Sequence, residues 1–254
     1  MISVSLNMMF WTDGLPDKTR DRNVAIAWPE MNKLANFLKK NNIEAECNMY
    51  DFSVEPVLDY AIHIPYPQGA YKRAEKANTI LKRANGDYFM LFDCDCFFRP
   101  SDYSKLLELF KNIHEKQLHT FDAMTPQDTI GDIFEGGNRF NEQYVKTWWY
   151  SYSGSQELGP LANGMKGGLG GIYIINTQLF LNNGGYNERF TVWGGEDGEA
   201  MSMLTHKISD LDIRPNRDFA PIHLPHDRDI HNISYFGDEQ EQQRIRGTEY
   251  YRYR

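Results

Sequence analysis

The chain has 254 residues, of which 41% are hydrophobic and 24% charged, an ordinary composition for a folded domain with a substantial core. Its formal net charge of −8 excludes general nucleic-acid binding, which needs a basic surface, although a few local Lys and Arg side chains can still hold a small anion. The three cysteines, Cys47, Cys94 and Cys96, indicate a reducing compartment without a disulfide framework.

The sequence has no basic N-terminal region followed by an apolar run, so we expect no signal peptide. No apolar stretch approaches the ~20 residues that a transmembrane helix needs. We therefore expect a cytoplasmic protein. The basic and aromatic residues 250–254 leave peripheral contact with the inner membrane face open, but a frayed end is the preferred interpretation.

Strand and helix patterns alternate through the first half of the chain. The expected strands cover residues 2–8, 43–49 and 88–93, and the expected helices cover residues 22–40, 70–84 and a segment that begins at Ser101 or Asp102. Pro29 is expected to start or kink the first helix, and Asn41-Asn42 to end it. Such alternation predicts a parallel sheet with crossover helices.

The second half begins with a less regular stretch. Residues 125–170 are rich in Gly, Asn, Tyr and Trp, which is more typical of substrate-facing loops than of a framework. A short strand at 171–175, a short helix at 177–182 and a helix after Gly194-Gly195 are expected to follow. Because no repeat or linker is present, residues 1–254 are predicted to form a single domain.

The segment Tyr88–Asp95 is the most informative of the chain, since apolar and aromatic residues run directly into an Asp-x-Asp pair. This pattern predicts a buried strand that delivers two carboxylates to the carboxyl edge of the sheet, where open α/β folds bind ligands. Strand alternation places Asp93 and Asp95 on the same side, where a divalent cation bridging to a diphosphate would relieve their repulsion. Cys94 and Cys96 could also indicate a metal site, but because they flank Asp95 they are expected to point away from it and to serve as small packing residues. Two solvated turn carboxylates are the alternative.

A second candidate group is the segment Trp193, Gly194, Gly195, Glu196 and Asp197. Paired glycines let the backbone approach a ligand closely, and a helix start tolerates the two carboxylates. A carboxylate there can act as a general base on a hydroxyl group, and the Trp can cover a sugar ring. A helix-capping motif with a buried Trp is the alternative.

The histidines His223 and His226 form a third candidate group, because imidazole joins carboxylates readily in binding Mn²⁺. Either could complete the coordination sphere that the aspartates begin. Strict alternation would place them on opposite faces of a strand, but Pro225 can bend the chain between them. Taken singly, a histidine is more often not a ligand.

Together these segments resemble the metal-dependent glycosyltransferases of the GT-A fold, above all the β-1,4-galactosyltransferases and the bacterial chondroitin-polymerase-type domains. The resemblance covers most of the chain and is carried, in order, by Thr19–Asn23, Tyr71–Ala74 with Asn78, Asp93–Asp95, Gly168–Ile175, Trp193–Asp197 and His226–Asp229. The implied fold is a Rossmann-like α/β domain with a mixed sheet flanked by helices. It also implies a nucleotide-binding half at about residues 1–122 and an acceptor and catalytic half at about 123–254.

The resemblance implies a role for each matching residue. Asp197 corresponds to the general base, with Glu196 beside it. Asp95 and His226 correspond to metal ligands, and His223 stands where the family has a methionine ligand. The implied donor-binding residues are Arg20, Arg22, Arg73, Asn78, Asp93, Gly171, Trp193, Gly194 and Gly195. Because imidazole is a harder ligand than a thioether, Mg²⁺ is expected to compete better with Mn²⁺ here.

The implied activity is an inverting, metal-dependent transfer of a hexose from a UDP-sugar to a hydroxyl group of a glycan or glycolipid, as in polysaccharide biosynthesis. The metal and Arg73 would neutralise the diphosphate while Asp197 deprotonates the acceptor. Residues 125–163 would select the acceptor, and residues 226–238 would move when nucleotide binds. Galactose, N-acetylgalactosamine, N-acetylglucosamine and glucuronic acid stay open as the transferred sugar.

Other classes fit the sequence less well. A catalytically inactive UDP-sugar- or glycan-binding module is the non-enzyme alternative, although the carboxylates and histidine of the motifs are retained. A haloacid-dehalogenase-type phosphatase would place Asp-x-Asp near the N-terminus with Thr or Val where Phe97 stands. A sugar nucleotidyltransferase would need a basic, Gly-rich loop after the first strand, and Met8–Gly14 is not one.

Overall fold

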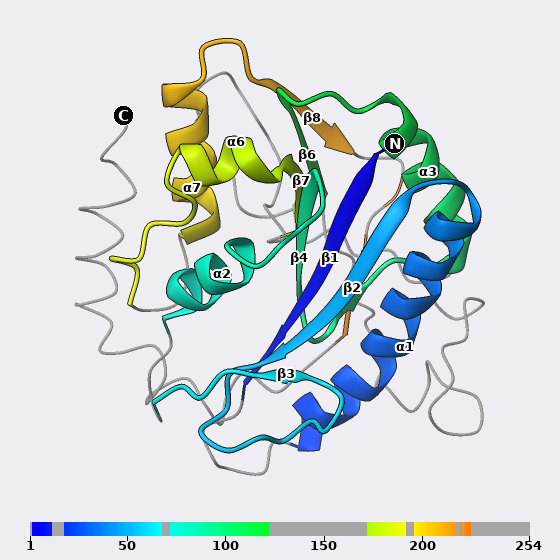
Figure 1. Cartoon of the computed structure of the whole chain (residues 1–254), viewed down its shortest axis with the longest axis vertical. Coiled ribbons are helices and arrows are strands. Elements are labelled where there is room, and N and C mark those ends of the chain that lie inside the picture. Colours follow the sequence, from blue (N-terminus) through cyan, green and yellow to red (C-terminus); the bar gives the residue numbers. More distant parts are fainter. Residues whose placement is uncertain are drawn as a thin grey trace.

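The computed structural model describes residues 2–11, 18–67, 72–121, 172–191, 196–216, 219 and 221–224. Its centre is a seven-stranded sheet in the order β3-β2-β1-β4-β7-β6-β8 (Figure 1). The strands are β1 (Ser3–Phe10), β2 (Glu44–Asp51), β3 (Ile62–His63), β4 (Tyr88–Asp93), β6 (Gln117–Phe121), β7 (Tyr173–Asn176) and β8 (Asp212–Asn216). A second, two-stranded sheet pairs β5 (Cys96–Phe97) with β9 (Ile222–His223).

The sheet is mixed, as the resemblance to the GT-A fold implies. β1 pairs in parallel with β2 and β4, and β2 with β3, which is the arrangement that strand–helix alternation predicts. β7 runs antiparallel to both β4 and β6, whereas β6 and β8 are parallel. The parallel prediction therefore holds for the first half of the chain, and the antiparallel strand enters with the second half.

Helices cover both faces of the sheet (Figure 1). α1 (Lys18–Lys40) and α3 (Tyr103–Asn112), which follows a 3₁₀ turn at Pro100–Asp102, lie on one face, and α2 (Arg73–Leu81), α6 (Thr177–Asn182) and α7 (Glu196–Lys207) lie on the other. Each face has its own apolar core, because alternate residues of the central strands, such as Met90 and Leu91, point to opposite sides.

Several element boundaries differ from the sequence expectations. α1 begins at Lys18 rather than near residue 22, so Pro29 lies inside the helix and does not start it. Packing of the apolar face of α1 against the core stabilises the helix despite the backbone hydrogen bond that proline removes. Asp102 occupies the N-cap of α3 without capping it through its side chain, because its carboxylate pairs with Arg99 at 2.7 Å. Asn42 ends α1 in the left-handed region (φ 65°), close to the predicted end.

The turn before β4 depends on a glycine at a point of close contact. A Cβ atom on Gly86 would lie 2.5 Å from the backbone nitrogen of Ser5 in β1. The Gly86 N–H donates to Ser5 Oγ at 2.7 Å, which joins the start of β4 to β1. Gly86 therefore permits the start of β4 and β1 to approach each other closely, whereas the preceding helix α2 already ends at Leu81.

None of the helices in the described ranges combines the length and the apolar character that a membrane-spanning helix needs.

Candidate active site

The carboxyl end of β4 carries the two aspartates of the Asp-x-Asp motif. Asp93 is the last residue of β4, and Asp95 lies in the turn between β4 and β5. Strand alternation therefore does not extend to Asp95 and does not by itself place its carboxylate on the same side as that of Asp93. Asp93 Oδ1 lies 3.3 Å from Arg73 Nε, whereas Asp95 Oδ2 lies 3.5 Å from His223 Nε2. The motif thus contributes to two neighbouring groups of side chains.

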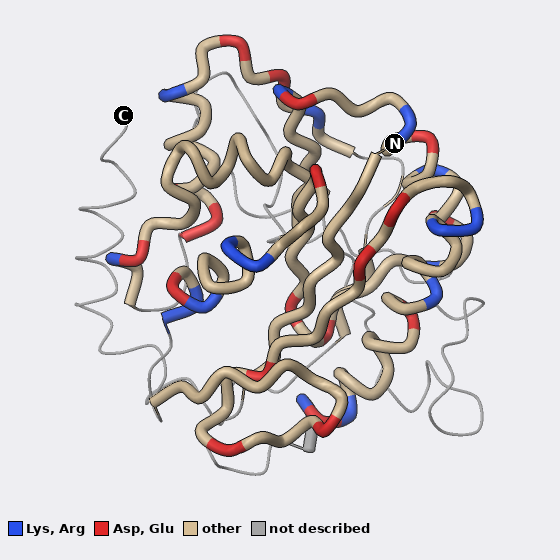
Figure 2. Tube along the Cα trace, viewed as in Figure 1, with Lys and Arg blue, Asp and Glu red and all other residues tan. Residues whose placement is uncertain are grey.

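The first group is organised by Arg73, at the start of α2, whose side chain is only 4% exposed. Its Nη1 donates to Asp197 Oδ1 at 2.9 Å and lies 3.6 Å from Glu196 Oε1, while its Nε contacts Asp93. Glu196 and Asp197 are the first residues of α7, where the helix dipole favours negative charge. In Figure 2 the acidic start of α7 lies beside α2. One guanidinium therefore links α2, β4 and α7.

Burial shapes the ionisation of this group, which we call the Arg73 cluster (Arg73, Asp93, Glu196 and Asp197). Burial raises the pKa of Glu196 to about 7, and the charge of Asp197 adds to this while Arg73 opposes it. Burial also raises the pKa of Asp197, against the opposing effect of Arg73 and with a further increase from Asp93. Burial alone would lower the pKa of Arg73, but the carboxylates of Asp197, Asp93 and Glu196 raise it well above its usual value.

Glu196 has an oxygen whose hydrogen-bonding capacity is not used within the described part of the chain. Its Oε2 atom is buried and has no hydrogen-bond partner there. A buried acceptor left without a donor is costly, whereas a protonated carboxyl group can donate to a ligand oxygen. This arrangement agrees with the raised pKa of Glu196, and it leaves one carboxyl oxygen available for a bound molecule.

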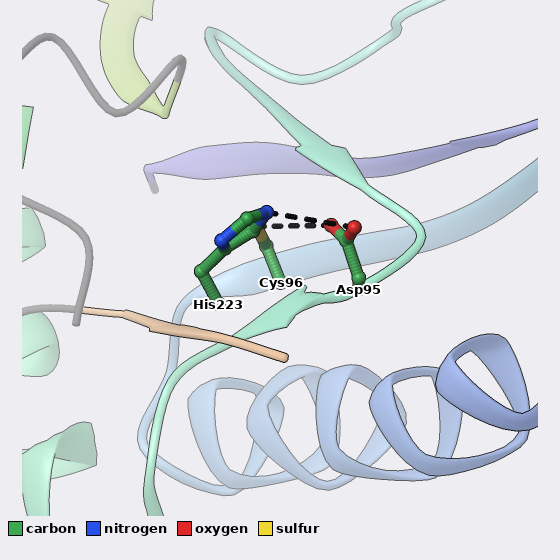
Figure 3. Close-up of side chains that lie close together, drawn as sticks. All are labelled: Asp95, Cys96 and His223. Carbon is green, nitrogen blue, oxygen red and sulfur yellow. Dashed lines mark hydrogen bonds and ion pairs between the residues drawn. The ribbon is translucent and has the colours of Figure 1, made fainter. Parts of the chain in front are cut away.

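The second group consists of Asp95, Cys96 and His223, whose donor atoms all lie within 4.8 Å of one another (Figure 3). The Cys96 thiol donates to Asp95 Oδ1 at 3.4 Å. The expectation that Cys96 points away from Asp95 is therefore wrong, because the turn after β4 starts a new register in β5. Cys94 is buried in the core as predicted, and all three cysteines of the chain are free thiols.

The donor types in this second group fit a divalent metal ion. Carboxylate and imidazole are ordinary ligands of Mn²⁺ and related ions, and a thiol adds a softer donor. Asp95 and His223 are both predicted metal ligands, and the pairing of β5 with β9 brings them together. The third predicted ligand, His226, lies outside the described residues.

The remaining predicted donor-binding residues have varied environments. Residues 19–23, which carry part of the resemblance, lie in the first turns of α1. Arg20 Nη1 donates to the carbonyl oxygen of Trp11 at 2.7 Å, and its guanidinium lies 4.8 Å from the centre of the Trp11 ring. Arg22 is exposed on α1. Gly171, Trp193, Gly194 and Gly195 lie outside the described residues, as do residues 125–163 and 226–238.

Asn78 makes hydrogen bonds that connect α2 to the turn after α6. Its Nδ2 donates to the carbonyl oxygen of Tyr186 and to Glu188 Oε1, at 2.8 and 2.9 Å, and its Oδ1 accepts from the Tyr186 N–H at 2.8 Å. These contacts hold the turn after α6 against α2. The contacts occupy both ends of the amide, and the expected role of Asn78 in donor binding stays a prediction.

One buried cation was not recognised from the sequence as a site residue. Lys76 belongs to the helix expected at residues 70–84, and its side chain is only 1% exposed. Its Nζ lies 4.5 Å from the ring centre of Trp11 and 4.7 Å from that of Tyr66. The spacing from Arg73 could have revealed this position, since residues i and i+3 share a helix face.

Comparisons with known proteins agree with this fold. The sequence profile of a family described as "Glycosyltransferase like family 2" matches residues 51–220, about two thirds of the chain. No curated protein shows significant similarity to the chain. Among solved structures, a mutant of Drosophila β1,4-galactosyltransferase 7 in complex with manganese, UDP-Gal and xylobiose is similar with a TM-score of 0.54 and 13% identity, over 97% of this chain and 80% of that one.

Two further solved structures have the same likeness. GalNAc-T7 with UDP, GalNAc and Mn²⁺ gives a TM-score of 0.53 at 12% identity, over 97% of this chain and 48% of that one. S. aureus TarS in complex with UDP-GlcNAc gives 0.53 at 12% identity, over 96% of this chain and 64% of that one. At such identities the likeness establishes the fold, which is the GT-A fold that the sequence motifs predict. Because the family profile covers most of the chain, the protein belongs to the glycosyltransferase-like family 2.

Proposed function

We propose that the protein is an inverting, metal-dependent glycosyltransferase that moves a hexose from a UDP-sugar to a hydroxyl group of a glycan or glycolipid acceptor. The observation that carries this proposal is that Asp93, in the Arg73 cluster, and Asp95, paired with His223, lie two residues apart at the carboxyl end of β4. A candidate base and a candidate metal site adjoin there through neighbouring aspartates. The manganese and UDP-sugar in complexes of similar fold support the same assignment.

Asp197 is the proposed general base. Arg73 holds its Oδ1 at 2.9 Å, while the side chain keeps 19% of its surface exposed. That exposure suits a carboxylate that must receive an acceptor hydroxyl, and the ion pair fixes its orientation. As the acceptor oxygen attacks the anomeric carbon, the bond from that carbon to the diphosphate breaks and UDP leaves with the electron pair, while Asp197 takes the acceptor's proton and the anomeric configuration inverts. A positioned base of this kind contributes roughly 10²–10⁴-fold to the rate.

Glu196 is the proposed positioning residue beside the base. Its side chain is 4% exposed, and its pKa of about 7 means that a large share carries a proton at neutral pH. In that form Glu196 can donate a hydrogen bond to the donor sugar or the acceptor, through the oxygen that has no partner in the described part of the chain. The two adjacent carboxyl groups thus have different environments and separate roles.

Asp95, His223 and, by resemblance, His226 are the proposed ligands of Mn²⁺, with Mg²⁺ as the alternative. When bound, the ion supplies positive charge that stabilises the diphosphate leaving group. Asp93 is proposed to contact the ribose or sugar of the donor. The contacts of Arg73 with three carboxylates suggest that it mainly orients Asp93 and Asp197, in addition to any contribution to diphosphate binding.

The nucleotide side of the donor site is proposed to lie near Trp11, which follows the carboxyl end of β1, the strand beside β4. Arg20 and Lys76 approach the Trp11 ring, and Lys76 also approaches Tyr66. Aromatic faces accompanied by cations suit a base and an attached phosphate. Lys76 lies one helical turn beyond Arg73, so α2 would present both to the donor site.

The test is UDP release from a panel of UDP-sugars with Mn²⁺, with Mg²⁺ or with chelator. Wild type is compared with Asp95→Ala and Asp197→Asn, and with Asp59→Ala as an exposed carboxylate control. We expect turnover of one donor that depends on metal, survives in the control and is lost in both site variants.

Two other results would lead to different conclusions. If UDP binds in a metal-dependent manner but no donor turns over with any acceptor in a glycan panel, the protein is a binding module. If neither UDP nor metal binds, the metal-dependent transferase assignment is wrong.

A further inference from the structure

We propose that the thiol of Cys96 is a third protein ligand of the metal ion held by Asp95 and His223, and that it gives the centre a preference for thiophilic divalent ions over Mg²⁺. This inference rests on the proposed function, because it concerns the same metal site. It adds a ligand that the sequence motifs do not indicate, since Cys96 lies outside the Asp93–Asp95 motif and matches no metal-binding position of the resemblance.

The distances among the three side chains suit a shared ion. Cys96 Sγ lies 3.4 Å from Asp95 Oδ1, His223 Nε2 lies 3.5 Å from Asp95 Oδ2, and the donor atoms all fall within 4.8 Å of one another. Zinc bonds of about 2.0 Å to oxygen, 2.0–2.1 Å to nitrogen and 2.3 Å to sulfur, in tetrahedral arrangement, place neighbouring ligand atoms about 3.3–3.6 Å apart. The separations of Asp95 from Cys96 and from His223 are therefore already close to the distances between neighbouring ligand atoms around a bound ion.

The backbone holds all three donors in place. Cys96 and His223 are direct partners in the antiparallel β5–β9 pair, so their side chains leave the same face of the ladder. The Leu224 N–H donates to the carbonyl oxygen of Asp95 at 2.8 Å, which fixes the turn that carries the carboxylate. In Figure 3 the three side chains point toward one another from these segments. A site on paired strands is better preorganised than one on loops.

The environment favours a ligand role over an accidental contact. Cys96 is 2% exposed and Asp95 9% exposed, so a carboxylate, an imidazole and a thiol share a largely buried space. A cation would compensate the buried carboxylate and accept electron pairs from all three groups. On binding, the thiol releases its proton to solvent and bonds the ion as a thiolate.

The thiolate changes the expected choice of metal. Sulfur ligands favour Zn²⁺, Cd²⁺ and Co²⁺, whereas Mg²⁺ prefers oxygen ligands. The replacement of a thioether by the imidazole of His223 suggested better competition by Mg²⁺, but a thiolate at Cys96 argues in the opposite direction. We therefore expect binding of Zn²⁺ and Cd²⁺ to be tighter than that of Mn²⁺, and Mg²⁺ to bind least tightly.

The test is spectroscopic and does not depend on activity. The full chain is stripped with chelator and titrated with Co²⁺ and with Cd²⁺, while absorption is recorded for the thiolate-to-metal charge-transfer band. The band is expected in wild type, Cys47→Ser and Cys94→Ser, and absent in Cys96→Ser. Calorimetry should show that Cys96→Ser lowers Zn²⁺ affinity by at least about tenfold, with little change for Mg²⁺.

A double variant, Cys47→Ser with Cys94→Ser, leaves Cys96 as the sole thiol of the chain. A band in this variant assigns the ligand even if Cys96→Ser does not fold. Metal binding without a band, or a band that persists in folded Cys96→Ser, overturns the inference and leaves the transferase proposal intact. If no divalent ion binds, both the thiol ligand and the metal dependence of the proposed function fail.

Discussion

At the scale of single residues, Arg73 determines the geometry of the candidate active site. It is buried, and its planar guanidinium reaches Asp93 through Nε and Asp197 through Nη1 at the same time. A buried cation surrounded by carboxylates lowers the cost of their burial, and each contact also fixes an orientation. The site residues of α2, β4 and α7 therefore depend on one another.

The first prediction concerns the shape of that guanidinium. In Arg73→Lys the charge is kept, but a single ammonium nitrogen cannot reproduce the fork that contacts Asp93 and Asp197. We expect kcat to fall roughly tenfold or more, with a smaller change in the KM for the donor. Arg83→Lys, at an exposed position shortly after α2, is the matched control. Full activity of folded Arg73→Lys would contradict the positioning role.

The second prediction concerns pH. Asp197 must lose its proton to act as base, and its pKa is raised by burial, so activity should rise with pH above the ordinary aspartate range. Glu196, with a pKa of about 7, loses its proton later, and its hydrogen-bond donation to the substrate is lost as the pH rises through that value. We expect a bell-shaped profile of kcat/KM.

Variants of Glu196 and Asp197 distinguish the two limbs of the pH profile. In Glu196→Gln the amide still donates but does not titrate, so the fall near neutral pH should disappear while the acidic limb stays. Asp197→Asn should lose roughly 10²–10⁴-fold of the rate across the whole range. A profile of Glu196→Gln that keeps the fall near pH 7 would assign that limb to another group.

At the scale of elements, the contact between α2 and the turn after α6 supports the site. Asn78 on α2 binds the backbone of Tyr186, and this requires Gly185 in the left-handed region with φ +65°. A Cβ atom on Gly185 would lie 2.5 Å from Asn78 Oδ1, whereas one on Gly184 would meet nothing within 4 Å. Gly184 is therefore required only for its backbone conformation, whereas Gly185 is required both for its conformation and for the space that Asn78 occupies.

The third prediction follows from that difference. Gly184→Ala is expected to destabilise the fold by about 1 kcal/mol, since φ +103° is strained for any residue with a side chain. Gly185→Ala should cost more, about 2–3 kcal/mol, because it adds a clash with Asn78 to the same kind of strain. Denaturant unfolding of both variants measures the difference. Equal decreases in the free energy of unfolding of the two variants would mean that Asn78 moves aside without cost.

At the scale of the whole molecule, the candidate site joins segments that are distant in sequence. Arg73 and Asp197 are 124 residues apart, and Asp95 meets His223 through the pairing of β5 with β9. The Arg73–Asp197 contact also crosses the predicted division near residue 122 between a nucleotide half and an acceptor half. That division stays a prediction, but the two halves would share one catalytic cluster.

The fourth prediction is that a bound ion stabilises the whole fold. Because Asp95 and His223 come from separate segments, an ion that binds both favours the folded state over the unfolded chain. At 100 times its Kd an ion contributes about 2.7 kcal/mol, which corresponds to a rise of about 5–10 °C in Tm. Thermal melts with and without Mn²⁺ should show this rise in wild type and Asp59→Ala. Asp95→Ala should show little or none.

Local sequence patterns predicted much of the fold because they reflect local physics. The apolar run of β4, the helical spacing of α2 and the short helix α6 each appear close to where they were expected. The boundaries of α1 and α2 were less well predicted, because tertiary packing decides how far a helix extends.

The sequence by itself determined which chemical groups the protein has, and the order of its motifs indicates the GT-A fold. Tertiary structure decided which of those groups meet. The linking of Asp93 to Asp197 by Arg73, the structural use of Asn78 and the turn of Cys96 toward Asp95 all depend on contacts between distant segments. Strand and helix periodicity extend only along one element, so the side chains that meet across elements are set by how the elements pack.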